Sequence, residues 1–563
     1  MSSFTQPLRR WLLRGSAVWL AVNLAGMAAA APPPSAAIAS AHPEATRAGH
    51  AILAAGGNAF DAAVAVSAVL AVVEPYGSGL GGGGFWLLHR ATDGHEVMVD
   101  GRERAPLAAS HDMYLDAAGE PVPGLSIAGP LAAGIPGTPA ALDHLAANYG
   151  RLPLAQSLAP AIRLAREGVA VDAHYSRLAA FRLAALRATP GESPYLDVGK
   201  VPEPGWSLRL PELAVALEHL AREGRDGFYR GPLARQLVDG VRAAGGIWSH
   251  EDLANYRVVE RDPVRGQIGG LRFTAASLPS SGGIVLAEIL NILADDRYAQ
   301  LTADARDHLL VEAMRRAYRD RADYLGDSDF VDVPIARLLS PDYAAGLRAG
   351  IRHDRATPSA LLPGVADTTT GTNTTHFSIL DREGNRVAAT MSLNYPFGSG
   401  FVPPGTGVLL NDEMDDFSLR PGVPNVYGLV GNAANAIAPG KRMLSSMTPT
   451  FLDDGERVAI IGTPGGSRII TMVLRAALAW DAGASAEEMV SMKRFHHQYV
   501  PDVVNYEEGA LTAEEIAQLQ SLGHDLRKTS RPFGNMNVVT WDFDSGEVSS
   551  AADPRGEGEA RVY

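Results

Sequence analysis

The stretch 371–394 constrains the fold most, because it combines a strand hairpin with a threonine at the start of its first strand. Small hydroxyl residues end at Thr374, and from there every second residue is apolar, which is typical of a half-buried strand. The composition of 381–385 indicates a turn, and 386–393 is expected to form the returning strand. An ordinary hairpin explains this stretch as well as a functional junction does, so the rest of the chain has to decide between them.

Strands and helices are expected on both sides of a polar, breaker-rich segment at 352–372. Helices are expected at 45–55, 59–73, 140–149, 154–167, 210–223, 232–244, 283–294, 303–325 and 467–480. Strands are expected at 85–89, 97–100, 408–411, 457–461, 536–543 and 547–551. Helix 59–73 is apolar nearly all round, so we expect it to lie buried against a sheet. This pattern predicts a layered α/β sandwich.

Local signals add two expectations for the helical segments. Capping boxes, Ser485 with Glu488 and Thr512 with Glu515, predict the start of two further helices. Residues 314–321 interleave charged and apolar side chains, which predicts a solvated helix face.

The N-terminus is typical of a targeting segment. Arg9, Arg10 and Arg14 precede the apolar, alanine-rich run 17–31. The run is short for a membrane span, so we expect residues 1–31 to be a cleaved signal peptide, with an uncleaved anchor as the alternative. The mature protein is then expected to be periplasmic or secreted. The net charge of -14 argues against partners that need a basic face, namely nucleic acids and membrane surfaces.

The chain has no cysteine, which limits the chemistry it can perform. Disulfides, thiolate metal sites and cysteine nucleophiles are excluded, so covalent catalysis has to use Ser, Thr, Lys or a carboxylate. The Gly-x-Ser-x-Gly pattern of serine hydrolases is also missing. Residues 77–84 are glycine-rich but lack the Lys-Ser/Thr of a phosphate-binding loop, so close backbone packing explains them better.

Metal sites fit the residue spacing poorly. A calcium loop starting at Asn411 would have Asp416 where Gly is needed and Gly422 where Glu is needed. The adjacent His496 and His497 would point to different sides of a helix or a strand. We therefore expect neither a metal nor another cofactor.

A threonine nucleophile remains. A threonine hydroxyl needs an adjacent base, and an N-terminal threonine supplies one as its own α-amine. Thr374 becomes N-terminal if the chain is cut after Asn373, and its hydroxyl can make that cut by attacking the Asn373 carbonyl to give an ester that water opens. The same hydroxyl would then serve as the catalyst.

Several segments support this hypothesis through a resemblance. Segments 374–378, 411–418, 421–428, 445–447 and 464–468 closely resemble motifs of the γ-glutamyltransferases, or glutathione hydrolases, in the family's order. That family consists of N-terminal-nucleophile enzymes with a four-layer αββα sandwich. The resemblance extends from the glycine-rich run at 77 to 552–555, which is nearly the whole mature chain.

The resemblance implies a set of site residues. Thr374 would be the nucleophile, and the roles of the other residues follow the charges of a γ-glutamyl group. Arg102, Ser445 and Ser446 would bind its α-carboxylate, Asp416, Glu413 and Asn394 its α-ammonium, and Gly465 and Gly466 the oxyanion. The glycine pair precedes a predicted helix, whose free N–H groups and positive dipole end favour negative charge.

Two further positions complete this expected site. Ser392 departs from the family, which commonly has threonine there to hydrogen-bond the nucleophile, but it keeps the hydroxyl. The loop 421–441 resembles the family's lid, with Tyr427 as its gate, which suggests a closed pocket for small γ-glutamyl compounds.

The resemblance also implies processing and partners. Residues 32–373 would form a large subunit and 374–563 a small catalytic subunit, both needed for one fold. Glutathione is the expected donor, and water, amino acids or peptides are the acceptors. Two alternatives stay open: a cephalosporin or glutaryl acylase, which needs no carboxylate for an ammonium group, and an unprocessed binding protein that keeps the sandwich as a scaffold.

Overall fold

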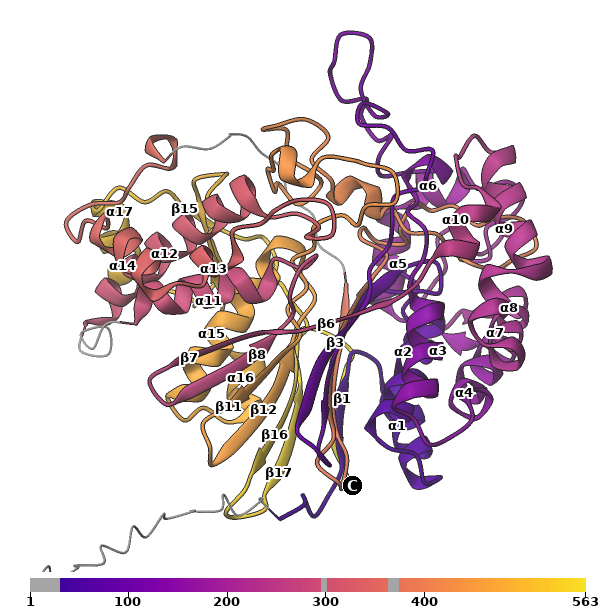
Figure 1. Cartoon of the computed structure of the whole chain (residues 1–563), viewed down its shortest axis with the longest axis horizontal. Coiled ribbons are helices and arrows are strands. Elements are labelled where there is room, and N and C mark those ends of the chain that lie inside the picture. The colour runs from indigo at the N-terminus through magenta and orange to yellow at the C-terminus, as the bar shows by residue number, and fades with distance from the viewer. Residues whose placement is uncertain (1–30, 295–300, 363–373) are drawn as a thin grey trace, which may run out of the picture. The chain divides into compact units, whose positions relative to one another are not determined.

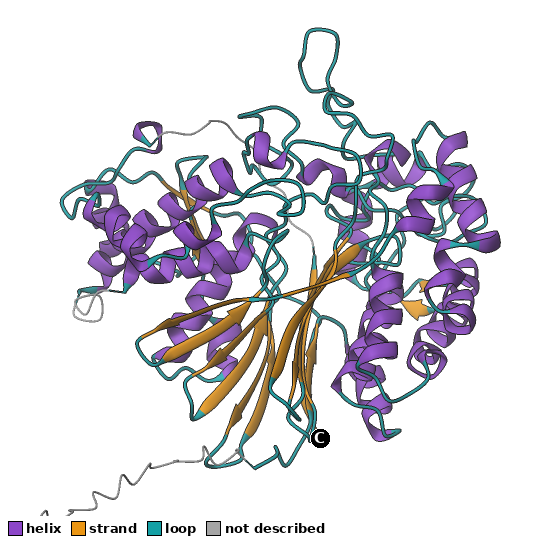
Figure 2. Ribbon diagram, viewed as in Figure 1, coloured by secondary structure: helices purple, strands orange, loops and turns teal. Residues whose placement is uncertain are grey.

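Two stacked antiparallel sheets lie between two layers of helices in this computed structural model, which describes residues 31–294, 301–362 and 374–563 (Figures 1 and 2). Within these residues, the larger sheet has the order β18 (Glu559–Val562), β1 (Ala37–Ser40), β9 (Thr375–Leu380), β10 (Arg386–Ser392), β2 (Gly83–Arg90), β3 (His95–Gly101) and β6 (Val259–Arg261). The smaller has the order β17 (Val548–Ala552), β16 (Asn537–Asp542), β12 (Arg457–Gly462), β11 (Thr450–Asp453), β8 (Leu271–Ala275) and β7 (Val264–Ile268). The predicted αββα sandwich is confirmed.

Each sheet carries its own helical layer (Figure 2). Beside the larger sheet lie α1 (Pro43–Ala54), α2 (Ala59–Val73), α3 (Thr138–Asn148), α4 (Leu154–Glu167), α5 (Ala173–Phe181), α6 (Leu183–Arg187), α7 (Pro211–Glu223), α8 (Arg225–Tyr229), α9 (Gly231–Ala243) and α10 (His250–Asn255). Beside the smaller sheet lie α11 (Gly282–Leu293), α12 (Ala303–Tyr324), α13 (Ile335–Leu338), α14 (Pro341–Ala349), α15 (Ile469–Asp481), α16 (Ala486–Ser491) and α17 (Ala513–Ser521). Short strands β4 (Val169–Ala170) and β5 (Ser207–Leu208) pair with each other, as do β13 (Phe495–His496), β14 (Val504–Tyr506) and β15 (Leu526–Lys528).

Successive side chains of β2 point alternately into two different hydrophobic cores. Phe85 and Leu87 belong to the core that lies between the sheets, whereas Trp86 and Leu88 belong to the core shared with the helices. Successive strand residues point to opposite faces, and both faces of this sheet are covered. Helix α2 is buried along its whole length and packs on β9 and β10, as its apolar sequence predicts.

The hairpin of β9 and β10 is confirmed and is tied to the helical layer. The strands pair from Met391 opposite Thr375 to Arg386 opposite Leu380. At the turn, the Asp381 carboxylate accepts hydrogen bonds from the backbone N–H of Asn385 at 3.0 Å and from that of Ala59, at the start of α2, at 2.9 Å. This anchoring fixes the position of the hairpin's other end, where its first strand begins and its second strand finishes.

The glycine-rich run packs backbone against backbone, as predicted. A Cβ on Gly82 would lie 2.1 Å from the carbonyl oxygen of Ser392, and one on Gly81 would lie 2.0 Å from that of Leu409. The predicted strand 408–411 is wrong. Only Leu410 pairs there, in a single bridge with Gly81, because this segment crosses the glycine run at one point instead of following it.

Most predicted helices and both capping boxes are confirmed, but three expectations fail elsewhere. Strands β6 to β8 interrupt the region of expected helices between 140 and 294, and neither the edge strand β18 nor its neighbour β1 had been predicted. The solvated face at 314–321 is wrong, because these side chains of α12, including Arg315 and Arg321, are mostly buried.

The signal-peptide prediction falls almost wholly on residues 1–30 and lies outside the described residues, as does Asn373. Within the described part of the chain, none of the helices is long and apolar enough to cross a membrane.

Candidate active site

Thr374 lies immediately before β9, and Ser392 ends β10, so pairing of the two strands brings them together. Their hydroxyl oxygens are 3.4 Å apart. The backbone N–H of Asn394 donates to the Ser392 hydroxyl at 2.8 Å and orients it. The serine that replaces the family's threonine therefore keeps a hydroxyl within reach of Thr374.

A small buried cavity opens beside these hydroxyls and gathers most of the predicted site. It is lined by Thr374, Ser392, Asn394, Glu413, Asp416, Tyr427, Leu429, Ser445, Ser446, Met447, Gly466 and Ile469. Of the predicted residues, Arg102 lies behind this lining and Gly465 faces another cavity. The volume of about 20 Å³ leaves room for roughly one water molecule, so a larger ligand needs the walls to move.

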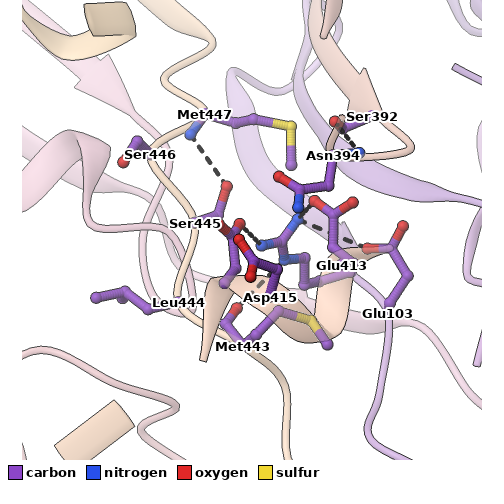
Figure 3. A network of polar contacts seen from close by, with 12 residues as sticks. Glu103, Ser392, Asn394, Glu413, Asp415, Met443, Leu444, Ser445, Ser446 and Met447 are labelled. Atoms are coloured by element: carbon purple, nitrogen blue, oxygen red, sulfur yellow. Dashed lines mark hydrogen bonds and ion pairs between the residues drawn. The ribbon is translucent and has the colours of Figure 1, made fainter. Parts of the chain in front are cut away.

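Arg102 follows β3 directly, is fully buried, and is the centre of charge in this site. Figure 3 shows three residues of this cluster, Glu103, Glu413 and Met443. Its guanidinium forms ion pairs with Glu413 and, at 2.5 Å, with Asp416. Its Nε donates to the carbonyl oxygen of Met443 at 3.2 Å. Burial raises the pKa of both carboxyls, and the charge of Arg102 opposes that shift. The residues predicted for an α-carboxylate and those predicted for an α-ammonium thus pair with each other.

Glu103 is a neighbour that the sequence reasoning missed. Its carboxylate lies 3.7 Å from Arg102 Nη1, and neither of its oxygens has a hydrogen-bond partner among the described residues. Burial raises its pKa well above the usual range, and the nearby Glu413 adds to that rise. Burial therefore favours the neutral form of Glu103, and the two carboxylates that line the cavity are the nearer ion-pair partners of Arg102.

Arg321 of α12 was also missed, since its segment was expected to be solvated. Its Nη2 donates to the hydroxyl of Ser446 at 3.2 Å and its Nε to that of Ser281 at 3.0 Å. Within the described residues it has no ion pair with a carboxylate. Burial lowers its pKa to about 10, so it stays charged at neutral pH. The serine side of the cavity therefore has a second guanidinium behind it.

The loop 421–441, predicted as a lid, contributes Tyr427 and Leu429 to the lining of the cavity. The hydroxyl of Tyr427 donates to the carbonyl oxygen of Asn394, and the ring is buried. The Asp415 carboxylate, missed in the sequence, accepts from the backbone N–H of Val426 at 2.8 Å. The Asp416 carboxylate accepts from Asn425 at 2.9 Å. One short acidic segment thus contacts both Arg102 and the loop 421–441.

Gly465 and Gly466 lead into a 3-10 turn (Gly466–Arg468) and then α15, so the helix predicted from 467 begins with a tighter turn. Gly466 has a φ of +58°, and a Cβ there would lie 2.4 Å from the Tyr427 ring. Only glycine allows the lid's aromatic ring this close to the backbone. The Arg468 N–H donates to the Gly465 carbonyl oxygen at 3.2 Å, and the N–H groups at the start of a helix favour negative charge nearby.

The described residues hold no group of three or more His, Asp or Glu side chains arranged to bind a metal ion.

Two helix-covered sheets with a hydroxyl at the head of an inner strand define an N-terminal-nucleophile hydrolase. The family model described as gamma-glutamyltranspeptidase matches residues 45–563. The chain belongs to this family.

Comparisons with individual proteins agree. The chain is 44% identical over 489 residues to a glutathione hydrolase proenzyme of Pseudomonas sp. (strain A14), covering 85% of this chain and 84% of the relative. It is 42% identical over 521 residues to one of Pseudomonas aeruginosa, covering 91% of each.

Among solved structures, the chain is similar to the Helicobacter pylori gamma-glutamyltranspeptidase with 39% identity and a TM-score of 0.55, over 57% of this chain and 93% of the other. A cephalosporin acylase from Bacillus halodurans matches with 28% identity and a TM-score of 0.82, over 99% of this chain and 98% of the other.

Proposed function

We propose that this protein is a self-processing γ-glutamyltransferase and glutathione hydrolase. It cleaves the γ-glutamyl amide of glutathione and related compounds through an ester on Thr374, and passes the acyl group to water, an amino acid or a peptide. One observation carries the proposal: Thr374 lines a small cavity that also offers two carboxylates backed by a buried guanidinium. These are the charges that recognise the two ends of an α-amino acid.

Self-processing makes the nucleophile. The Thr374 hydroxyl attacks the Asn373 carbonyl, the peptide nitrogen leaves as the new α-amine of Thr374, and water opens the resulting ester. Residues up to 373 then form the large subunit and 374–563 the small one. The 3.4 Å approach of Ser392 supports this step, because a second hydroxyl can orient the first. Strands β9 and β2 come from opposite sides of the cut, so both subunits remain in one sheet.

When the donor binds, its charged groups replace the ion pairs that Arg102 makes with Asp416 and Glu413. The α-carboxylate of the γ-glutamyl group takes a place on Arg102, with the hydroxyls of Ser445 and Ser446, and the α-ammonium takes a place on Asp416 and Glu413 with the side chain of Asn394. A zwitterion adds no net charge, so the cluster stays balanced while its internal ion pairs are replaced. This exchange favours α-amino acids, because a ligand with only one of the two charges leaves a buried charge without its partner.

The chemical step needs a base and an oxyanion site. The α-amine of Thr374 takes the hydroxyl proton as the oxygen attacks the γ-carbonyl, then delivers it to the departing nitrogen. The N–H groups of Gly465 and Gly466 stabilise the oxyanion. The Tyr427 ring covers this turn and keeps water away until the lid opens.

Arg321 gives a prediction about donor affinity. Arg321→Gln removes the buried charge behind Ser446, so we expect KM for γ-glutamyl-p-nitroanilide to rise about 10-fold, the loss typical of one charge-assisted contact. Processing and kcat should change little, because Arg321 contacts neither Thr374 nor the oxyanion turn. Steady-state kinetics measure the split between KM and kcat.

The matched control is Arg316→Gln, another buried arginine on α12, which pairs with Glu312 instead of the site serines. An equal rise in KM in both variants would show that Arg321 supports the structure and does not contribute specifically to donor binding.

The acylase alternative keeps the same nucleophile and fold, and the cephalosporin acylase neighbour makes it the second candidate. An acylase for glutaryl side chains has no ammonium to bind, whereas this cavity exposes Glu413 and Asp416. Comparing glutathione with glutaryl amides as donors separates the two, and we expect clear turnover of glutathione alone.

N-terminal sequencing of the purified protein tests the processing step. We expect two fragments, with the small one starting at Thr374 and the large one starting near residue 32 after removal of the signal peptide during export. A single full-length chain that persists on incubation would favour an unprocessed binding protein and would overturn the proposed function.

A further inference from the structure

Thr374 also lines a second, much larger cavity on the side away from the small one. This cavity has a volume of about 620 Å³. Its walls come from α5, the turn at 464–468, the segments 501–505 and 527–535, and residues 555–557. Gly465 lines the large cavity and Gly466 the small one, so the Thr374 hydroxyl and the glycine turn stand between the two. An acyl group held in the small cavity therefore has its scissile bond directed toward the large one.

The large cavity is basic. Of the described residues that line it, the cationic ones are Arg177, Arg468, Arg527, Lys528, Arg531 and Arg555, and the acidic ones are Glu74 and Glu557. Burial raises the pKa of Glu74 to about 7, so its charge is partly lost at neutral pH. The lining is therefore strongly positive, in a chain whose net charge is -14.

Several of these cations lack an acidic partner. Arg555 pairs with Glu507 and Asp553, and Lys528 pairs with Glu508. Among the described residues, no carboxylate lies within ion-pair distance of the other four arginines, which are Arg177, Arg468, Arg527 and Arg531. A positively lined cavity with unpaired guanidinium groups favours an anionic ligand, and guanidinium groups suit carboxylates because they donate two parallel hydrogen bonds.

Arg468 is the best placed of these arginines. It ends the turn that begins at the glycine pair, three residues after Gly465, and its guanidinium stacks on the Phe533 ring, 4.7 Å from the centroid. The side chain is half-buried, and stacking holds it in place. A held, partly dehydrated guanidinium binds a carboxylate more strongly than a mobile surface one. Arg531 stands on the exposed rim of the same cavity, in the segment that contains Phe533.

We propose that the large cavity is the subsite for the leaving group and for the acceptor that replaces it, and that Arg468 and Arg531 select amines that end in a free carboxylate. This inference rests on the proposed function. When the donor reacts, the C–N bond of its γ-amide breaks, the Thr374 ester forms, and the leaving amine takes the proton from the Thr374 α-amine. An incoming amino acid or peptide then forms a new C–N bond at the same carbon while the ester C–O bond to Thr374 breaks, and the proton lost by the incoming amine passes through the Thr374 α-amine to the Thr374 oxygen.

The test compares two donors with the same γ-glutamyl group. Glutathione releases an amine that carries a carboxylate, whereas γ-glutamyl-p-nitroanilide releases a neutral one. For Arg468→Gln and for Arg531→Gln we expect the ratio of kcat/KM for glutathione to kcat/KM for the anilide to fall about 10-fold, the usual cost of one charge-assisted contact. As a control, Arg382→Gln removes an exposed arginine far from the cavity, in the hairpin turn, and should leave the ratio unchanged.

The acceptor arm uses glycylglycine and glycylglycine amide, which differ only in the terminal carboxylate. The unmodified enzyme should prefer the free carboxylate, and both variants should lose that preference. An unchanged donor ratio together with an unchanged acceptor preference would overturn the subsite. Failure of the unmodified protein to release p-nitroaniline would instead overturn the proposed function, so the two failures are distinguishable.

Discussion

Thr374→Ala is expected to stay a single chain and to release no product from glutathione or γ-glutamyl-p-nitroanilide. One hydroxyl is assigned both the cut at Asn373 and the catalytic attack, so removing it abolishes both. Loss of a nucleophile lowers the rate by about 10⁴-fold or more in enzymes that work through an acyl intermediate. A denaturing gel after prolonged incubation, followed by an assay for p-nitroaniline, measures the two effects on the same sample.

Two controls make this result specific. Thr374→Ser keeps a hydroxyl and should still be processed, more slowly. Thr375→Ala removes the next hydroxyl along the chain, which donates to Glu74 at 2.8 Å and has no part in the proposed chemistry. Processing of Thr375→Ala and its absence in Thr374→Ala would assign the cut to one hydroxyl. Cleavage after Asn373 in Thr374→Ala would show that another group performs it.

Elements whose signals are local could be predicted from the sequence. The composition of 381–385 predicts the turn of the hairpin of β9 and β10. Helix α2 is predicted by its capping asparagine and by its nearly continuous apolar run. The strands that were missed form because they pair with segments far away in the sequence. β1 is four small or apolar residues long, and only its pairing with β9 on one side and β18 on the other makes it a strand.

Contacts within the site also depend on residues that are far apart in the sequence. A resemblance could assign Arg102 and Asp416 to opposite ends of a ligand, but no spacing in the sequence shows that they bind each other when the site is closed. Their contact is set by β3 meeting the acidic 3-10 turn Glu413–Asp416, which lie more than 300 residues apart in the chain.

The segment 314–321 was misjudged for a related reason. Its alternating charges are typical of a solvated helix, yet most of these side chains are buried because partners arrive from elsewhere. Arg315 bonds Ser359 and Asp502, and Arg321 reaches Ser446. A charged side chain can therefore be buried when groups far away in the sequence hydrogen-bond or ion-pair with it, and the helical period of a segment does not show whether such partners exist.

The second large effect is expected for Asp416→Asn, which should process normally and discriminate poorly between donors. Asparagine keeps the shape and can still accept from Arg102, but it lacks the negative charge that an α-ammonium needs. We expect the ratio of kcat/KM for γ-glutamyl-p-nitroanilide to kcat/KM for glutaryl-p-nitroanilide to fall about 100-fold, the upper end of what one charged hydrogen bond contributes. The glutaryl group keeps the carboxylate and lacks only the α-amino group, so it reports the chemistry without recognition of the ammonium.

Asp415→Asn is the matched control. It lies on the same 3-10 turn, but its carboxylate accepts from Ser126 and from the backbone N–H of Val426 and does not contact Arg102. Any weakening of the lid should slow both donors together and leave their ratio unchanged. A similar fall in the ratio for both variants would mean that the turn acts through the lid, and an unchanged ratio in Asp416→Asn would remove Asp416 from ammonium recognition. Asp416 forms an ion pair with Arg102 in this structure. The result therefore also decides whether the charged groups of the substrate replace this ion pair on binding, or whether the pair is only a structural contact.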